Sequence, residues 1–214
     1  ISSTLMICFA VWKSSQDGIE EFRKTYGSNF NMEINNNLED SSLWESYTDP
    51  ITGAEAYNYK GSRLNDDVIE KVMSVQGIKT VCKEVETTLY FGDLDFIPGL
   101  HTSLAELKKT DPESFEGEVY NPDVTAKGGR LLGYSRSELS DYFRTNSYEL
   151  VEGRHLTEQD KDKILISDVL AKKNHLALGD TICGEQNKYL TELGDPSVII
   201  YKKNFEIVGI FHVN

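Results

Sequence analysis

The pattern of hydrophobic and polar positions predicts short strands and short helices along the chain. Strict alternation predicts strands at 30–34 and around Tyr57 and Tyr59, the second as one arm of a hairpin. Apolar residues at helical spacing predict a helix from Asn65 to about Gln76, which Gly77 ends. Further strands are expected at residues 78–91, 131–134, 148–150, 163–166, 181–183, 198–201 and 205–213.

Cap and turn residues predict where further helices and loops begin. Capping-box spacing, a serine followed three residues later by glutamate, occurs at Ser42, Ser103 and Ser135 and predicts a helical turn at each. Residues 117–130 are polar and glycine-rich, so we expect a loop there, with a short strand at 118–120 as an option. The Lys-Lys-Asn run at 202–204 is predicted to be the loop of the last hairpin.

The clearest unit lies within residues 148–184. An apolar run at 163–166 has the composition of a buried strand, and Ser167 stands where a helix N-cap belongs. A short helix follows, and Gly179 can adopt the left-handed conformation that ends it. The predicted order is therefore strand, capped helix, glycine turn and strand, without an evident catalytic group.

The N-terminal segment is the most apolar part of the chain. A membrane span needs about 20 apolar residues, so residues 1–12 cannot cross a bilayer alone. Trp12 and Lys13 close the segment with the aromatic and cationic pair typical of membrane interfaces. Apolar residues then recur at helical spacing up to Gly27. We expect the outer end of a transmembrane helix that continues as a stalk; an amphipathic helix and a buried strand are the alternatives.

Composition excludes several classes of protein. The 214 residues, 39% of them apolar, can bury the core of one large domain or two small ones. A formal charge of −13 argues against binding to nucleic acid or to an anionic lipid surface. Cys8, Cys82 and Cys183 are an odd number at no metal-ligand spacing, which excludes a disulfide scaffold and a CxxC site. A Cys82–Cys183 bridge stays open.

No motif predicts a metal site, a catalytic residue or a cofactor. The four histidines match no HExxH pattern, and Asp93 and Asp95 do not complete a calcium loop. Ser135 lies in a GYSRS run that lacks the final glycine of a nucleophile elbow, so a helix cap explains it better. Phosphate-binding loops are absent, and the 35 acidic residues are only a weak signal for a hydrolase. Four tyrosines suit either a ligand groove or cross-strand packing: Tyr47, Tyr57, Tyr59 and Tyr90.

Three segments carry a resemblance to a known family. They are GRHLTEQD at 153–160, AKK at 171–173 with LGDTI at 178–182, and FEIVGIF at 205–211. In this order they resemble the MacB-like periplasmic core domain, the extracytoplasmic domain of FtsX-like ABC transporter permeases. VMSVQGIKTV at 72–81 is similar to another segment of that family. The resemblance is clearest over residues 148–211 and concerns fold signatures rather than chemical groups.

The resemblance implies an α+β fold, with a mixed α/β porter-like lobe, a second, mostly β, sabre-like lobe and a long N-terminal helix as stalk. We predict residues 1–27 as the membrane-proximal helix, 28–91 as the first part of the porter-like lobe and 92–214 as the sabre-like lobe. Both ends of the chain look cut from a longer protein.

The function that the resemblance implies is not enzymatic. Such a domain stands outside the cell membrane and couples ATP-driven motion of the permease's transmembrane helices to a cargo or partner. Its implied partners are those helices, a separate cytoplasmic ABC ATPase and a second permease copy. Two alternatives remain: a secreted or surface-anchored peptide- or glycan-binding module, and a carboxylate-dependent hydrolase.

Overall fold

The computed structural model describes residues 2–25, 29–50, 53–118 and 120–214, and the chain divides into two units, Ile1–Asn35 and Asn36–Asn214. In the first unit, helix α1 (Ser2–Thr25) precedes residues 29–35, which have no regular secondary structure. The predicted helix end at Gly27 falls outside the described residues, and the role of α1 as a stalk stays a prediction. Among the described residues, no helix combines the length and apolar character needed to cross a bilayer.

The strand predicted at 30–34 is wrong. Phe30 and Met32 lie on the alternating pattern, yet they are 61% and 46% exposed. Alternation produces a strand only where a neighbouring strand completes the hydrogen-bond ladder and a core covers one face. Neither condition is met by residues 30–34 in the described structure.

The second unit begins with an antiparallel hairpin of β1 (Trp44–Thr48) and β2 (Glu55–Tyr59), as predicted for the tyrosine-rich arm. The rings of Trp44 and Tyr59 form a cross-strand pair with centroids 5.0 Å apart. The capping box at Ser42 does not start a helix. Instead, Asp40 shapes a turn by accepting the backbone N–H of Ser42 at 3.1 Å, and β1 follows directly.

Helix α2 (Asp66–Met73) begins where it was predicted, because Asn65 accepts the Val68 N–H at 3.1 Å. It ends three residues earlier than expected. The strand predicted at 78–91 is also shorter: β3 (Glu84–Tyr90) covers only the part that pairs with a neighbour.

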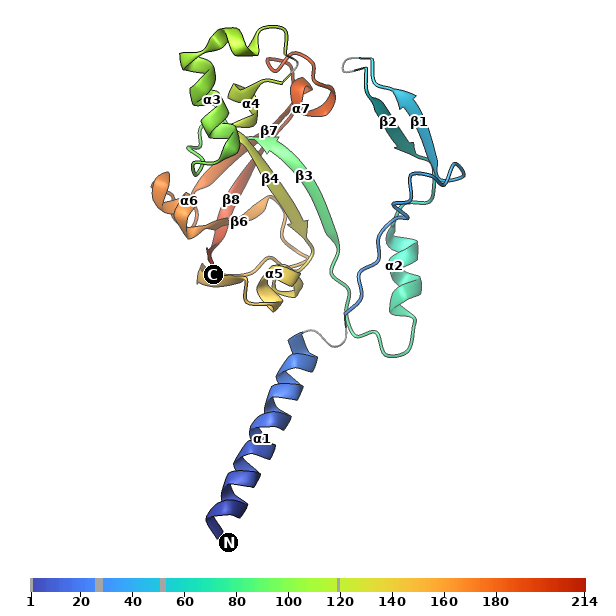
Figure 1. Cartoon of the computed structure of the whole chain (residues 1–214), viewed down its shortest axis with the longest axis vertical. Helices are drawn as coiled ribbons and strands as arrows, with labels where there is room; N and C mark the ends of the chain where they lie inside the picture. The colour runs from blue at the N-terminus through green and yellow to red at the C-terminus, as the bar shows by residue number, and fades with distance from the viewer. Residues whose placement is uncertain (1, 26–28, 51–52, 119) are drawn as a thin grey trace. The chain divides into compact units, whose positions relative to one another are not determined.

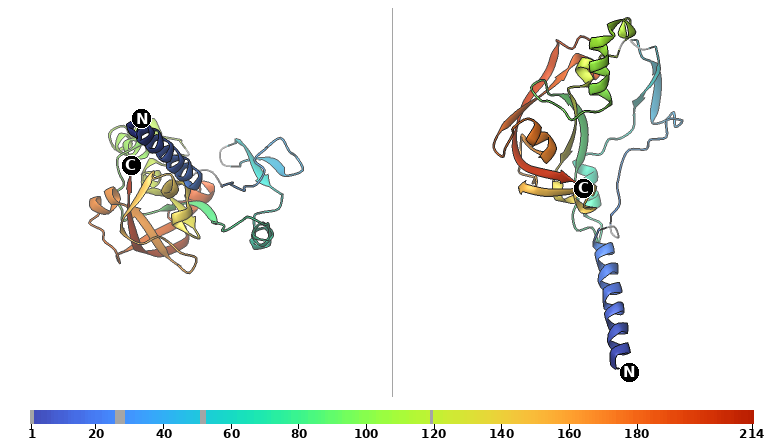
Figure 2. Two further views of the ribbon diagram at one scale, coloured as in Figure 1. Left: turned by 90° about the horizontal axis from the view of Figure 1, so that it is seen from below. Right: turned by 60° about the vertical axis from the view of Figure 1, so that its left-hand side comes forward.

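A six-stranded sheet forms the body of the second unit (Figure 1). Its strand order is β4-β3-β7-β8-β5, and β6 also pairs with β8. The pairs are antiparallel except β6 with β8, which is parallel. Figure 2 shows how strongly the sheet curls. The remaining strands are β4 (Gly128–Tyr134), β5 (Tyr148–Gly153), β6 (Lys163–Ser167), β7 (Thr181–Asn187) and β8 (Ile199–Val213).

Strand β8 is continuous over 15 residues, so the hairpin loop predicted at 202–204 is wrong. Lys202 and Lys203 lie opposite Glu185 and Gly184 of β7. The Lys202 ammonium is 2.6 Å from the Glu185 carboxylate. The chain turns instead between β7 and β8, where α7 (Lys188–Glu192) lies. A lysine pair is typical of a loop by composition, but here it has strand neighbours to pair with.

Short helices pack around the two ends of the sheet. In Figure 1, α3, α4 and α7 gather at one end and α5 lies at the other. Helix α3 begins at Leu100, before the predicted start at Ser103, because the Thr102 hydroxyl bonds to Gly99. The remaining helices are α3 (Leu100–Thr110), α4 (Pro122–Thr125), α5 (Asp141–Arg144) and α6 (Asp168–Lys173), with 3-10 turns η1 (Pro112–Phe115) and η2 (Ser137–Leu139).

Two predictions in the middle of the chain are corrected. The expected loop at 117–130 contains α4 and the start of β4. The optional strand at 118–120 includes residue 119, outside the described residues, and its other two residues are not in a strand. Ser135 does not cap a helix: its hydroxyl accepts the Lys83 N–H at 2.9 Å, and Ser140 caps α5.

One apolar core lies within the curl of the sheet. Ile207 of β8 is fully buried, and Leu89 of β3, Ile166 of β6 and Ile182 of β7 are each 4–5% exposed. The fold is therefore mixed α+β, with a curled, largely antiparallel sheet and several helices, as the predicted class required. The predicted boundary at 91/92 falls directly after β3, a strand that pairs with β4 and β7.

Candidate functional site

The GRHLTEQD segment forms a closed turn after β5. The Arg154 guanidinium donates to both carboxylate oxygens of Asp160, at 2.7 Å each. The backbone N–H and the hydroxyl of Thr157 donate to the same carboxylate at 2.8 and 3.0 Å. The Arg154 guanidinium, together with the Thr157 donors, holds the pKa of Asp160 well below its usual range. The motif thus pairs its own charges within the turn.

Two glycines let this turn approach β8 closely. Gly153 has φ +76°, a backbone conformation that favours glycine, and a Cβ there would clash with the Val208 carbonyl oxygen. A Cβ on Gly209 would lie 2.6 Å from the Arg154 carbonyl oxygen. Between them, the Arg154 N–H donates to the Val208 oxygen at 2.9 Å. The glycines of the first and last signature segments therefore meet at one crossing.

The middle signature segment joins β8 as well. Ser167 caps α6 by accepting the Leu170 N–H at 3.3 Å, as predicted. Gly179, with φ +88°, donates its N–H to the Ile207 oxygen at 2.8 Å. The Asp180 carboxylate accepts the Ala177 N–H at 2.8 Å and holds the turn closed. The first two segments that carry the family resemblance thus meet the third, which lies in the second half of β8.

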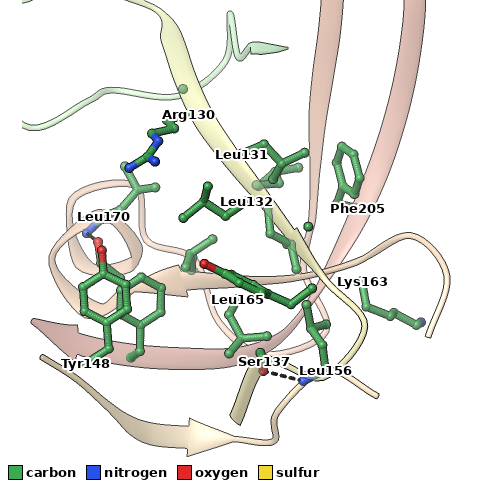
Figure 3. Close-up of a pocket in the computed structure, with 18 of the residues that line it drawn as sticks. Arg130, Leu131, Leu132, Ser137, Tyr148, Leu156, Lys163, Leu165, Leu170 and Phe205 are labelled. Atoms are coloured by element: carbon green, nitrogen blue, oxygen red, sulfur yellow. Dashed lines mark hydrogen bonds between the residues drawn. The ribbon is translucent and has the colours of Figure 1, made fainter. Parts of the chain in front are cut away.

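A cavity of about 380 Å³ opens inside the curled sheet (Figure 3). Leu131, Leu132, Leu165, Leu170 and Phe205 of β4, β6, α6 and β8 are among the residues that line it. Aromatic rings form one of its walls. Tyr148 stacks on Tyr142 and on Phe211, with ring centroids 4.6 Å apart in both pairs.

A serine and a histidine lie together at the edge of this cavity. The Ser137 hydroxyl is 3.1 Å from Nδ1 of His155 and accepts the Leu156 N–H at 2.9 Å. Burial lowers the pKa of His155. A hydroxyl beside a neutral imidazole can act as a nucleophile–base pair. Ser137, however, is only 2% exposed. Its hydroxyl oxygen already holds the backbone after β5 through the Leu156 N–H, so we interpret the pair as a packing contact.

Sequence reasoning missed this pair because it considered Ser135 in the GYSRS run. Ser137 occupies the position at which a nucleophile elbow requires glycine. No local signal relates it to His155, which lies 18 residues later.

The other histidines and acidic candidates are dispersed. His212 Nδ1 lies 2.8 Å from the Asp168 carboxylate, and His101 Nδ1 lies 2.7 Å from the Tyr120 hydroxyl. Asp95 pairs with Lys127 at 3.2 Å. In the part of the chain that the structure describes, no three His, Cys, Asp or Glu side chains come together as a metal site.

The structure places the cysteines and the tyrosines that the sequence singled out. Cys82 and Cys183 are free thiols, and Cys82 contacts the Arg136 carbonyl oxygen at 3.3 Å, so the bridge left open by the sequence is not formed. The side chain of Cys8 lies outside the described residues. Tyr47, Tyr57 and Tyr59 lie on the β1–β2 hairpin, whereas Tyr90 is on β3.

Comparison with known proteins adds no relative: no family model, curated protein or solved structure matches the chain.

Proposed function

We propose that this chain is the extracytoplasmic domain of an FtsX-like ABC transporter permease of the MacB type. The observation that carries the proposal is that the first two signature segments both bond to the third, which is part of β8. Gly153 and Gly209 allow a close backbone approach at that strand, and Gly179, with its positive φ, donates its N–H to Ile207 of the same strand. If the signature specifies a fold, its segments, although separate in sequence, are expected to serve the same structural feature.

The contacts of the signature residues favour mechanical coupling over catalysis. Arg154 pairs with Asp160 within one turn, and Asp180 accepts the Ala177 N–H within another. These contacts stiffen the two turns, which bond to β8 through the backbone N–H groups of Arg154 and Gly179. A stiff domain can transmit motion from membrane helices to a cargo or partner outside the membrane.

The proposal includes the finer arrangement that the resemblance implies. Residues 28–91 and 92–214 would contribute the porter-like and sabre-like lobes, and α1 would be the stalk. The domain itself would not be an enzyme. A separate cytoplasmic ABC ATPase would supply the energy, and a second permease copy would complete the assembly in the cell membrane.

Thiol labelling of the full-length gene product in whole cells tests this placement. The native cysteines are replaced by serine, and Lys172→Cys is introduced on the exposed face of α6. A membrane-impermeant maleimide should label it in intact cells. Ala171→Cys is the matched control, because Ala171 is 4% exposed and should react only after unfolding. Labelling of Lys172→Cys only after lysis would contradict the proposal.

The partners are tested by purification of the same full-length protein in detergent. We expect an ABC ATPase to copurify with it, and hydrophobic segments of about 20 residues to flank the chain in its gene. A membrane anchor without any associated ATPase would favour the peptide- or glycan-binding module instead.

A further inference from the structure

The cavity inside the curled sheet has the size and lining of a ligand site. Its volume of about 380 Å³ falls within the range of small-molecule pockets, roughly 300–1,000 Å³. Apolar cavities of only about 150 Å³ stay dry and take up benzene. Leu132, Leu165 and Tyr148 line the space while remaining half-buried, so their apolar surface is not consumed by the core.

The charges around the cavity determine which ligand suits it. Four charged side chains line the space, and each has an ion-pair partner outside the lining. The four pairs are Arg130–Glu86, Asp160–Arg154, Asp162–Lys203 and Lys163–Glu206, with separations of 2.5–2.8 Å. A charged ligand would lose its hydration without gaining an unpaired counter-charge from these residues.

The aromatic wall indicates the shape of the ligand. Tyr142, Tyr148 and Phe211 form a stack, and Phe143 meets Tyr148 edge-on at 5.8 Å. Aromatic rings favour offset-stacked and edge-to-face neighbours. A flat ring system therefore suits a cavity that has these rings in its lining.

We propose that this cavity binds an uncharged aromatic small molecule. The site lies wholly within the second unit and does not depend on the permease proposal. Its ligand would be recognised by contact with aromatic rings and with apolar side chains, Leu132 and Leu165 among them.

Fluorescence titration with N-phenyl-1-naphthylamine, an uncharged aromatic probe, tests the proposal on the purified chain. Leu132→Trp should fill the cavity and weaken binding at least about tenfold. Leu107→Trp on α3 is the matched control, since Leu107 is 46% exposed and does not line the cavity, and its affinity should equal that of the wild type. Equal affinity of all three proteins would overturn the proposal.

A charged analogue of the probe tests whether the cavity selects uncharged ligands. The sulfonate analogue 8-anilinonaphthalene-1-sulfonate carries the same rings with one negative charge, and we expect it to bind at least about tenfold more weakly. Equal affinity for the two probes would show that the cavity does not select uncharged ligands.

A measurement on the unmodified protein tests the proposal without relying on the correct folding of a variant. On addition of N-phenyl-1-naphthylamine, the NMR methyl signals of Leu132 and Leu165 should shift, whereas those of Leu107 should not. Shifts confined to other methyl groups would overturn the proposal. An apparent affinity that increases with protein concentration would instead identify an interface between copies as the probe site, and would also overturn the proposal.

Discussion

Asp160, the last residue of the GRHLTEQD segment, holds together the turn after β5. Its side chain is 12% exposed and accepts four hydrogen bonds, two from Arg154 and two from Thr157. Hydrogen bonds to a charged group are among the stronger ones, because the ionised acceptor attracts each donor more strongly. We therefore expect the ionised carboxylate, rather than the residue's bulk, to stabilise the turn.

Replacement of this carboxylate should change stability in a pH-dependent way. Asp160→Asn should lower the free energy of unfolding at pH 7 by roughly 1–3 kcal/mol. The pKa of Asp160 is lowered in the folded state, so its contribution is present above the unfolded pKa of about 3.9 and is lost as pH falls below it. The variant and the wild type should therefore converge in stability toward pH 2.

Urea unfolding at pH 7, 5 and 3 measures this difference. The exposed Asp93→Asn serves as the control and should follow the wild type at every pH. If the free energies of unfolding of Asp160→Asn and the wild type differed by the same amount at every pH, the variant would have lost the shape of the carboxyl group rather than its charge.

At the scale of elements, β8 organises the second unit. Its first part pairs with β7, and its later part pairs with β5 and β6. The sheet curls where these neighbours change, and Gly209 lies at that place between Arg154 and Leu165. The crossing is tight because the backbone of the GRHLTEQD turn occupies the space that a side chain would need.

A methyl group at this crossing should destabilise the fold. Gly209→Ala would place a Cβ 2.6 Å from the Arg154 oxygen and 2.9 Å from Leu165, and we expect a loss of roughly 1–3 kcal/mol. Thermal unfolding followed by circular dichroism measures it. Gly99→Ala is the matched control, because the nearest atom to its added Cβ is 4.0 Å away. Equal unfolding temperatures for the two variants would contradict the close crossing.

At the scale of the whole molecule, the second unit contains a complete core. Its nine core residues come from β3, the loop after it, β6, α6, β7 and β8, all within Asn36–Asn214. Because apolar burial supplies most of the stabilising free energy, this unit should not require the first 35 residues in order to fold.

A fragment of residues 36–214 should therefore unfold cooperatively. We expect its unfolding midpoint to lie within about 2 °C of that of the full chain, which corresponds to a free-energy difference of at most about 1 kcal/mol. Calorimetry and near-ultraviolet circular dichroism measure it. A fragment without a cooperative transition would show that residues 1–35 belong to the same folding unit.

The elements that sequence reasoning located correctly are those whose signals are local. Asn65 and Ser167 cap helices because their side chains reach a backbone N–H three residues later. Gly179 turns the chain because it adopts a positive φ at no steric cost. Each of these interactions closes within a few residues, so composition and spacing suffice to predict it.

The features that only the tertiary structure decided depend on contacts between residues that are far apart in the sequence. The 202–204 run became strand because β7 provides its partners, and 30–34 did not because no strand pairs with it among the described residues. The cavity likewise needs β4, β6 and β8 brought together. The sequence by itself determined the caps at Asn65 and Ser167 and the turn at Gly179, and its family resemblance implied the α+β class. Long-range strand pairing decided the length of its strands, the curl of its sheet and the cavity inside. The free energy of that pairing comes from residues far apart in the sequence, so a local pattern does not predict it.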